Sequence, residues 1–311
     1  MLKRILFYDI ILTILRLKKG ENRMKKEYIC AGGAIILWST LAASAKILFG
    51  TYSDTQLLCA SSLFAFLSLV ILNLVTGKMK LIRDFSPKDI LTMAAVGLPG
   101  VFLYYIFYYA GAERLPASQA FIINYMWPVM SIVFAIIILK EKLTARKAVA
   151  ILLSFVGVVF VAGEGILSFE DGAISGFILC FMGAVSYGLF TALSKKTGYD
   201  SSFAMMINCL VSFLLTLVIV LIENDPFVVT AGGILGLIWN GVFTLAIPNT
   251  LWVIAVSRGN TAKIANLAYI TPFLSMLWTS LLLKESVSLF SVIGLVIMVG
   301  GILIQLSSKG E

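Results

Sequence analysis

The chain has 311 residues, of which 60% are hydrophobic and 13% charged, and its mean hydropathy is +1.00. This composition is typical of a membrane protein and excludes an ordinary water-soluble domain. A spanning helix with its connection uses roughly 30 residues, so the length allows about ten crossings and almost no soluble domain. Histidine is absent, which excludes any mechanism that needs an imidazole base or a His-ligated metal.

Apolar runs of spanning length predict an all-α, polytopic membrane protein of ten transmembrane helices. Turn and charge signals such as Gly77, Pro116 and Lys284-Glu285 separate the runs. The four cysteines lie inside the runs rather than in paired loop positions, so we expect packing roles for them and no disulfide framework. In chain order, the predicted helices cover residues 28–48, 54–76, 88–109, 117–139, 144–161, 172–194, 200–222, 231–256, 262–283 and 288–306.

Residues 1–23 stand apart from this series. Their apolar stretch, Ile5 to Leu15, contains Asp9 and is only about 16 Å long as a helix, too short to span a bilayer. No small-residue cleavage site follows it, so a signal peptide is not expected. Two interpretations stay open, an interfacial segment and an upstream extension of the reading frame. The start-like sequence Met24-Lys25-Lys26-Glu27 favours the second.

The formal net charge of +8 and the pI near 9.3 reflect orientation in the membrane. Of the 24 Lys and Arg residues, 20 fall in segments that the predicted topology puts on one side, while eight acidic residues fall on the other. Basic loops face the cytoplasm. We therefore predict a multi-pass protein of the cell (inner) membrane with both termini cytoplasmic. The lipid bilayer is its expected partner, and nucleic acid is not.

Matching residues recur along the chain at two offsets. An offset of 150 aligns Cys30 with Cys180, Gly33 with Gly183, Lys46 with Lys196, Cys59 with Cys209 and Ser62 with Ser212. An offset of 144 aligns Arg114 with Arg258, Tyr125 with Tyr269, Pro128 with Pro272, Ser131 with Ser275 and Lys140-Glu141 with Lys284-Glu285. Matched prolines and charges are unusual between unrelated membrane helices, so they indicate an internal repeat.

The repeat divides the chain into a 1–23 extension or interfacial segment, a first half at 24–165 and a second half at 166–311. Each half holds five predicted helices. Because five is odd, the halves enter the membrane from opposite sides and are related by an axis in its plane. Two similar halves of opposite orientation can exchange between inward-open and outward-open states of comparable energy. This architecture indicates a transporter.

Four prolines fall inside predicted helices, and only in the third and fourth helix of each half: Pro99, Pro128, Pro248 and Pro272. Proline removes a backbone hydrogen bond and kinks a helix, which lipid tolerates where the freed carbonyl faces protein or a water-filled cavity. We interpret the four as gating kinks in helices that line a central cavity, with the fifth and tenth helices outside. Simple packing kinks are the alternative.

Polar and aromatic side chains follow the same four helices. Tyr104 and Tyr108 are four residues apart and share a helix face, and the further candidates are Asn124, Tyr125, Trp127, Trp252 and Tyr269. They offer hydroxyls, amides and ring faces without a buried carboxylate, which suits an amphipathic, partly aromatic solute. An interfacial aromatic belt is the alternative for residues near helix ends.

Two lysines lie within the predicted membrane region. Both are candidate substrate-binding residues. Lys46 is near a helix end, where snorkelling to the interface is the alternative, and Lys263 follows Arg258-Gly259-Asn260, where it is a candidate to hold an anionic group or to form a gate contact, with a structural role as its alternative. No set of metal ligands and no cofactor motif is present, so we expect neither a metal nor a cofactor.

Several motifs carry a resemblance to a known family: Leu37-Trp38-Ser39-Thr40, Asn124-Tyr125-Met126-Trp127-Pro128, Trp252 ahead of Gly259-Asn260, and Tyr269-Ile270-Thr271-Pro272. Over residues 24–306 the chain resembles the drug/metabolite transporter superfamily in its EamA-type, ten-helix form. The second motif is similar to that of the aromatic amino acid exporters within it. The resemblance implies a basket of two inverted five-helix halves with a central cavity. It also assigns Tyr187 to the cavity, where a tryptophan is usual.

We therefore predict an inner-membrane exporter of amino acids, aromatic or otherwise hydrophobic, with a small-molecule substrate. A multidrug or other metabolite carrier of the same superfamily is the alternative. An intramembrane enzyme would need a clustered nucleophile and base or paired buried acids, and the sequence has neither, so no enzymatic activity is expected. A scaffold or channel subunit would not need matched kinks in opposed halves. The expected oligomeric state is a monomer or weak homodimer, and the sequence leaves open whether transport is coupled to protons.

Overall fold

The computed structural model describes residues 23–167, 173–258, 264, 267–268, 270–286 and 288–306. Every regular element in these ranges is helical, which confirms the predicted all-α fold for this part of the chain. The 1–23 segment lies outside the described residues apart from Arg23.

The first half of the chain opens with a helix that is broken near its middle. The hydroxyls of Ser39 and Thr40 bond back to the carbonyls of Ile36 and Leu37 at this break, and serine and threonine side chains that do so often bend helices. The elements in order are α2 (Arg23–Trp38), α3 (Leu41–Leu48), α4 (Asp54–Val75), η1 (Lys78–Arg83), α5 (Pro87–Gly97), η2 (Leu98–Leu103), α6 (Tyr104–Arg114), α7 (Ala117–Asn124), α8 (Trp127–Leu139) and α9 (Ala145–Leu167).

The second half repeats much of this order. Its second long helix begins at an N-cap, where the Asp200 carboxylate accepts the backbone N–H groups of Ser202 and Phe203 and so satisfies two of the orphan donors of a helix start. The elements are α10 (Ala173–Thr197), α11 (Ser201–Glu223), α12 (Ala231–Ile238), η3 (Trp239–Ala246), α13 (Ile247–Arg258), α15 (Ile270–Leu283) and α16 (Leu289–Leu306).

Seven helical stretches in the described part of the chain are long and apolar enough to cross a membrane. They are Lys26–Leu48, Asp54–Val75, Pro87–Arg114, Ala117–Leu139, Ala173–Thr197, Ser201–Glu223 and Ala231–Arg258. α15 and α16 are shorter apolar helices, and α9 has 23 residues and runs past the predicted end at residue 161. The structure shows a multi-pass membrane protein, and the count of ten helices stays a prediction.

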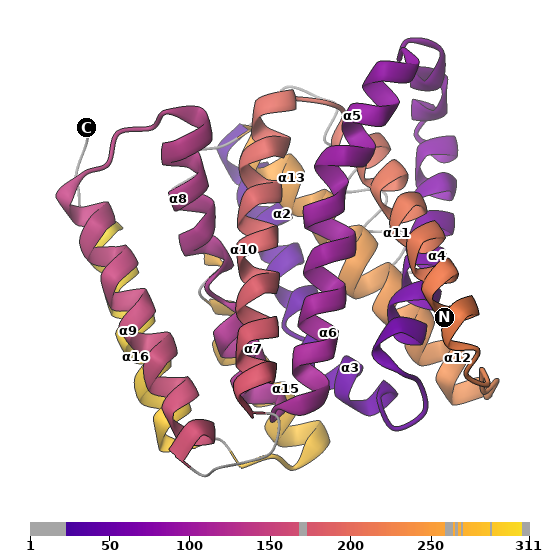
Figure 1. Ribbon diagram of the computed structural model, residues 1–311. Coiled ribbons are helices and arrows are strands. Elements are labelled where there is room, and N and C mark those ends of the chain that lie inside the picture. Colours follow the sequence, from indigo (N-terminus) through magenta and orange to yellow (C-terminus); the bar gives the residue numbers. More distant parts are fainter. Residues whose placement is uncertain are drawn as a thin grey trace.

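The helices form a central bundle with an outer pair at one edge (Figure 1). The outer pair is α9 and α16, which pack along each other. The bundle contains the remaining helices, and in it α4 packs on α11 while α10 packs on α6 and α8. The expectation that the fifth and tenth helices lie outside is therefore met.

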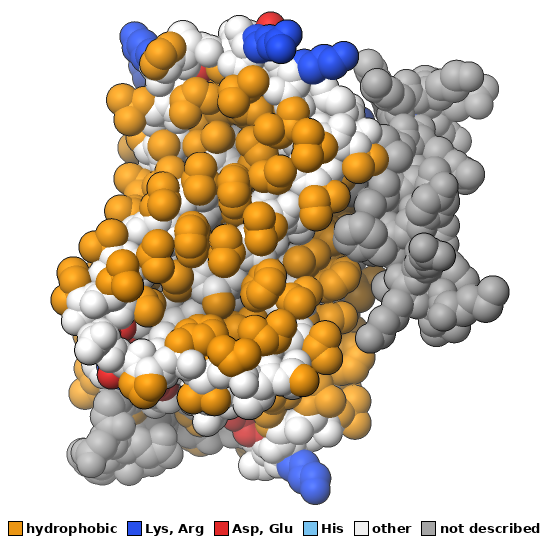
Figure 2. Space-filling model, turned by 90° about the vertical axis from the view of Figure 1, so that its right-hand side faces the viewer, with side chains coloured by type: hydrophobic (Ala, Val, Ile, Leu, Met, Phe, Trp, Pro, Cys, Tyr) orange, Lys and Arg blue, Asp and Glu red, His pale blue; other side chains and the backbone are white. Residues whose placement is uncertain are grey.

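The face formed by α4, α11 and α12 is apolar over most of its height, with basic side chains gathered at one end (Figure 2). Its exposed side chains include Leu74, Val218, Leu221 and Ile222. An apolar band that ends in charged rims is the surface expected of a protein surrounded by lipid.

Ion pairs identify the loops that share each end of the bundle. Lys78 pairs with Asp200 at 2.7 Å, and Lys195 pairs with Glu141 at 3.4 Å, so the helix 2–3, 4–5 and 6–7 connections of the predicted topology lie together. We call this the basic end. At the opposite end, the Glu285 carboxylate accepts the backbone N–H groups of Ala117 and Ser118.

Each of the four membrane prolines lies at a break in regular α-helix. Pro99 is inside η2, which has π-helical hydrogen bonding, and Pro248 is the second residue of α13, which follows the second π-helical segment, η3. Pro128 and Pro272 lie in the first turns of α8 and α15. A missing N–H costs little at a helix start, and π segments absorb the hydrogen bond that proline removes.

Candidate functional site

Seven aromatic side chains from five different segments meet in the centre of the bundle. We call them the aromatic cluster: Trp38, Tyr104, Tyr108, Tyr125, Trp127, Tyr187 and Trp252. Each is at most 8% exposed. Trp38 lies between Trp127 and Trp252, with ring centroids 5.9 and 5.4 Å away, and Tyr104 lies 4.8 Å from Tyr187. Mostly tilted or edge-on geometries at these distances are the favourable arrangements for aromatic pairs.

A chain of buried hydrogen bonds connects this cluster to the helices around it. The Tyr187 hydroxyl donates to Oδ1 of Asn249 at 2.7 Å, and Nδ2 of Asn249 donates to the Tyr105 hydroxyl at 3.1 Å. Tyr105 in turn donates to the carbonyl of Thr244 at 3.2 Å. Nδ2 of Asn124 donates to the Tyr104 hydroxyl at 2.8 Å. These bonds join α10, α6 and α7 to the segment around η3 and fix the ring positions.

A cavity of about 600 Å³ opens at the basic end of the bundle. Its mouth carries Lys78, Lys195 and Arg258, and its inner walls include Phe190 and Trp252. Trp252 lies six residues before Arg258 on α13, which is about 9 Å deeper along the helix axis. The volume lies in the range that encloses a small organic ligand.

The interior of the aromatic cluster, by contrast, is closed. The space bounded by Trp38, Tyr104, Asn124, Trp127 and Tyr187 amounts to about 10 Å³, roughly the minimum needed for one water molecule. The cluster therefore separates the large cavity from the opposite end of the bundle, and Trp252 belongs to both.

Several buried polar atoms at this site have no hydrogen-bond partner within the described part of the chain. They are Nε1 of Trp252, Oδ1 of Asn124 and the hydroxyl of Tyr108. Buried polar atoms are nearly always satisfied, so an unpaired one points to a ligand, an ordered water or strain. Trp252 lines the inner end of the cavity, but its indole N–H is buried and is not exposed to the cavity in this conformation.

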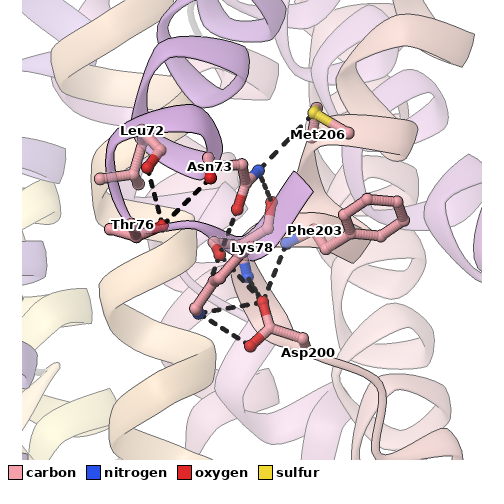
Figure 3. Close-up of polar contacts among 8 residues, drawn as sticks. Leu72, Asn73, Thr76, Lys78, Asp200, Phe203 and Met206 are labelled. Atoms are coloured by element: carbon pink, nitrogen blue, oxygen red, sulfur yellow. Dashed lines mark hydrogen bonds and ion pairs between the residues drawn. The ribbon is translucent and has the colours of Figure 1, made fainter. Parts of the chain in front are cut away.

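The rim of the cavity is held by a polar cluster at the junction of α4 and α11 (Figure 3). Nζ of Lys78 donates to both Asp200 carboxylate oxygens, at 3.0 and 2.7 Å, and to the Ser202 hydroxyl at 3.0 Å. The Ser202 hydroxyl also donates to Oδ1 of Asn73 at 2.8 Å. Burial alone would raise the pKa of the Asp200 carboxyl. The Lys78 ammonium and the Phe203 N–H outweigh it, so this pKa is lowered.

The predicted site residues fall into three groups. Tyr104, Tyr108, Asn124, Tyr125, Trp127, Tyr187 and Trp252 are brought together in and beside the aromatic cluster. Lys46 lies at the opposite end, where its ammonium donates to the backbone carbonyls of Ala112 and Leu115. Tyr269 and Lys263 lie outside the described residues.

Sequence reasoning missed two residues of the site. Trp38 contacts three other rings of the cluster. The Leu37-Trp38-Ser39-Thr40 motif, one of the carriers of the family resemblance, is the sequence feature that could have identified Trp38 as a site residue. Asn249 joins Tyr105 and Tyr187, and its signal was an amide deep in an apolar run next to Pro248. A buried amide in lipid needs partners, so it could have been paired with the tyrosines.

Several apolar spanning helices around a closed aromatic core, with a large cavity that opens at the basic end, are the architecture of a membrane transporter. The chain belongs to the EamA-like transporter family, whose model matches residues 25–163 and 174–307. This finding agrees with the resemblance seen in the sequence motifs.

Three similar proteins illustrate the range of relatives. An uncharacterized transporter of Clostridium kluyveri is 27% identical, over 92% of this chain and 94% of its own. The aromatic amino acid exporter YddG of Salmonella typhimurium is 22% identical, over 89% of this chain and 95% of its own. A solved crystal structure covers 90% of this chain and 96% of its own, at 22% identity and a TM-score of 0.70, and shows the fold.

Proposed function

We propose that this protein exports amino acids with aromatic or other hydrophobic side chains across the bacterial inner membrane by alternating access. The observation that carries the proposal is the cavity of about 600 Å³ that opens at the basic end and stops at Trp252. Trp252 forms this inner end, and its buried indole N–H, which has no partner in the described chain, becomes available to a ligand when the aromatic cluster opens. An amino acid carries a carboxylate that can accept this donor and a side chain that can lie against the rings.

The orientation follows from the basic residues. Lys78, Lys195 and Arg258 surround the mouth of the cavity, and loops rich in Lys and Arg face the cytoplasm. The basic end is then cytoplasmic, as are both termini, and the cavity is open to the compartment from which an exporter collects its substrate. The protein acts as a monomer or weak homodimer, without nucleic acid.

Alternating access requires two halves of opposite orientation, which we place at 24–165 and 166–311 with five helices each. Supporting this, the family model matches two separate stretches of the chain, and π-helical segments occur in the proposed third helix of each half. The breaks at Pro99, Pro128, Pro248 and Pro272 are then the places where helices bend during gating. A bend there disturbs few regular hydrogen bonds.

The aromatic cluster is the barrier that the substrate passes. Tyr104, Tyr108, Asn124, Tyr125, Trp127, Tyr187 and Trp252 close on each other in this conformation and open toward the other side in the next. Tyr269 and Lys263 contribute to the same path, as their positions in the fourth helix of the second half suggest. The naming of YddG relatives as aromatic amino acid exporters agrees with ring recognition.

Counterflow in proteoliposomes tests the proposal directly. Purified protein is reconstituted into liposomes loaded with unlabelled phenylalanine, and external labelled phenylalanine should accumulate transiently against its gradient. Leucine and methionine serve as aliphatic comparisons, and empty liposomes as the blank. Absence of counterflow for every amino acid, with correctly folded protein in the liposomes, would refute the proposal.

A carrier of anionic metabolites is the second candidate. The observation that favours it is the concentration of Lys78, Lys195 and Arg258 at the cavity mouth, with Asp200 the acidic residue among its lining residues. Such a mouth attracts anions by long-range electrostatics. Counterflow of a phosphorylated sugar or nucleotide, together with none for phenylalanine, would support this candidate.

A further inference from the structure

The ammonium of Lys46 forms a set of hydrogen bonds at the end of the bundle opposite the basic end. Lys46 lies near the end of α3, and its Nζ donates to the carbonyls of Ala112 at 2.8 Å, Leu115 at 2.7 Å and Glu113 at 3.4 Å. These carbonyls belong to the C-terminal turn of α6 and the residue after it, where helices leave acceptors unsatisfied. A cation at a helix C-terminus is also favoured by the helix dipole. One side chain thus ties the first helix of the chain to the end of its third.

The same connection is fixed from its other side. The Glu285 carboxylate accepts the N–H groups of Ala117 at 2.9 Å and Ser118 at 3.1 Å, at the start of α7. The short link between α6 and α7 therefore lies between two charged contacts. The Lys46 ammonium binds the carbonyls at the end of α6, and the Glu285 carboxylate binds the N–H groups at the start of α7. Glu285 comes from the second half of the chain, so its contacts join the two halves at this end, whereas the Lys46 contacts join two helices of the first half.

The structure supports the offset of 150 that relates the halves. Ser62 on α4 and Ser212 on α11 are matched by this offset, and their buried hydroxyls are hydrogen-bonded to each other at 3.0 Å. Equivalent residues can meet in this way only where the two repeats face each other across their common axis. The same offset matches Lys46 with Lys196, and the offset of 144 matches Ala112 and Glu113 with Val256 and Ser257.

At the basic end the matched groups are apart. Lys196 is exposed on the last turn of α10 and forms no hydrogen bond or ion pair within the described part of the chain. Val256 and Ser257, near the end of α13, line the open cavity. The end of the molecule with the lysine contact is closed, and the end without it is open.

We propose that Lys46 and Lys196 are paired gate residues of the transport cycle. Lys46 stabilises the state seen here, which is closed at the opposite end. In the alternate state Lys46 releases its carbonyls, and Lys196 donates to the carbonyls of Val256 and Ser257 and closes the basic end. The inference rests on the alternating access of the proposed function but not on the identity of the substrate. It assigns Lys46 to the gate rather than to substrate binding.

The test measures how often the opposite end opens. A cysteine at Leu41, which is 1% exposed and lines the closed space inside the aromatic cluster, should be labelled by a membrane-impermeant maleimide from the opposite side only when that end opens. Labelling rates are measured from each side, in right-side-out and inside-out vesicles. Lys46→Met should raise the rate from the opposite side about threefold to tenfold, and Lys196→Met should lower it by a similar factor, since each loses charge-assisted hydrogen bonds of one state.

The double variant Lys46→Met/Lys196→Met should return to a rate near that of the parent, because the two losses act on opposite states. Lys80→Met is the matched control, since Lys80 is also exposed at the basic end but has no matched acceptor. Lys46→Arg and Lys196→Arg, which keep a donor, should stay near the parent. Folded protein is quantified by size-exclusion chromatography, and all rates are expressed per folded molecule.

Three results would overturn the inference. They are an equal rate for Lys196→Met and Lys80→Met, a shift in the same direction for both gate variants, and no labelling from the opposite side in Lys46→Met. None of them depends on a transported substrate. If counterflow fails for every amino acid while labelling shifts as expected, the substrate assignment is wrong and the gate assignment stands.

Discussion

The central bundle and the outer pair α9 and α16 solve the same problem, packing helices in lipid, in different ways. In the bundle, the side chains of Asn240, Asn249 and Thr244 are completely buried, and each forms at least one hydrogen bond to the same or another helix. In the outer pair, apolar residues such as Leu152, Val159 and Val296 remain exposed, and Phe160 packs on Phe290 at 5.7 Å.

This contrast indicates that the interior of the bundle serves transport, whereas the contact between α9 and α16 is structural. Apolar surface gains little by moving from lipid into a protein interior, so packing alone can hold the outer pair. Buried polar groups are costly in a membrane unless they are satisfied, and they concentrate where a path for solutes is built. The bundle should therefore react strongly to small changes, and the outer pair weakly.

The largest difference should appear when one methyl group is added to a glycine. In the bundle, a Cβ at Gly241 would lie 2.4 Å from the Ser61 carbonyl oxygen, whereas a Cβ at Gly300 in the outer pair meets no atom of the described residues within 4 Å. Because Ser61 contributes backbone there, Gly241→Ala should destabilise the protein by about 1–3 kcal/mol. Gly300→Ala should be neutral or slightly stabilising, since alanine favours a helix.

Thermal unfolding followed by fluorescence-detected size exclusion, with both variants side by side, measures this difference. Equal melting temperatures for Gly241→Ala and Gly300→Ala would show that η3 can move away from α4 without cost. Close packing between η3 and α4 would then not contribute to the stability of the bundle.

Removal of a buried polar group gives the next largest contrast. Asn249→Leu leaves the Tyr187 hydroxyl without its partner and removes one of the two partners of the Tyr105 hydroxyl, which keeps the Thr244 carbonyl. An unsatisfied buried group costs about 1–3 kcal/mol. Ser154 in the outer pair is also buried, but its hydroxyl has no partner among the described residues. Ser154→Ala should therefore keep or raise the melting temperature, whereas Asn249→Leu should lower it. A loss for Ser154→Ala as large as for Asn249→Leu would contradict the contrast.

The sequence could predict the bundle better than the site inside it. The run 54–76 became α4, Asp54–Val75, and the four prolines fell at helix breaks, because hydropathy and proline chemistry are local properties. The tyrosines of α6 were expected to share a face and do so. Local properties do not tell which end is open, or that Lys46 bonds to carbonyls 66 and 69 residues away.

The interior of the predicted helices shows the same limit. The runs 88–109 and 231–256 each lie in a single spanning stretch, but both contain a π-helical segment. Hydropathy averages over such a break and does not register it. Trp38 was likewise missed as a site residue, because its neighbours in the cluster come from four other segments and only the tertiary fold brings them together.

Ring recognition by Trp127 should have a moderate effect, and a selective one. The ring lies 5.1 Å from Tyr187 and 5.4 Å from Trp252. Trp127→Leu keeps much of the apolar volume and deletes a ring worth about 0.5–1.5 kcal/mol in aromatic contacts. We expect counterflow of phenylalanine, tyrosine and tryptophan to fall about twofold to tenfold more than that of leucine or methionine. Equal losses for both classes, per folded molecule, would assign Trp127 to packing alone.

The smallest effect should come from the rim of the bundle, where Asp200 pairs with Lys78. The pKa of the Asp200 carboxyl is lowered in the folded protein. The stability it contributes is therefore fully present above its ordinary value, near 3.8, and is lost as the pH falls through the lower folded value. The pair is partly exposed, so the contribution should be about 1 kcal/mol or less.

Melting temperatures between pH 7 and pH 3 measure this contribution. At pH 7, Asp200→Asn should melt slightly below the parent. The difference should begin to shrink as the pH falls below about 3.8 toward pH 3, because the unfolded parent then binds a proton at Asp200 before the folded parent does. Asp84→Asn is the matched control, since Asp84 is exposed just after η1 and bonds only through its backbone, and its curve should follow that of the parent. If the gap between Asp200→Asn and the parent instead stays constant down to pH 3, the Lys78–Asp200 charge pair does not stabilise the rim. The Asp200 side chain would then act there only as the N-cap of α11, a role that the polar Asn side chain can also fill.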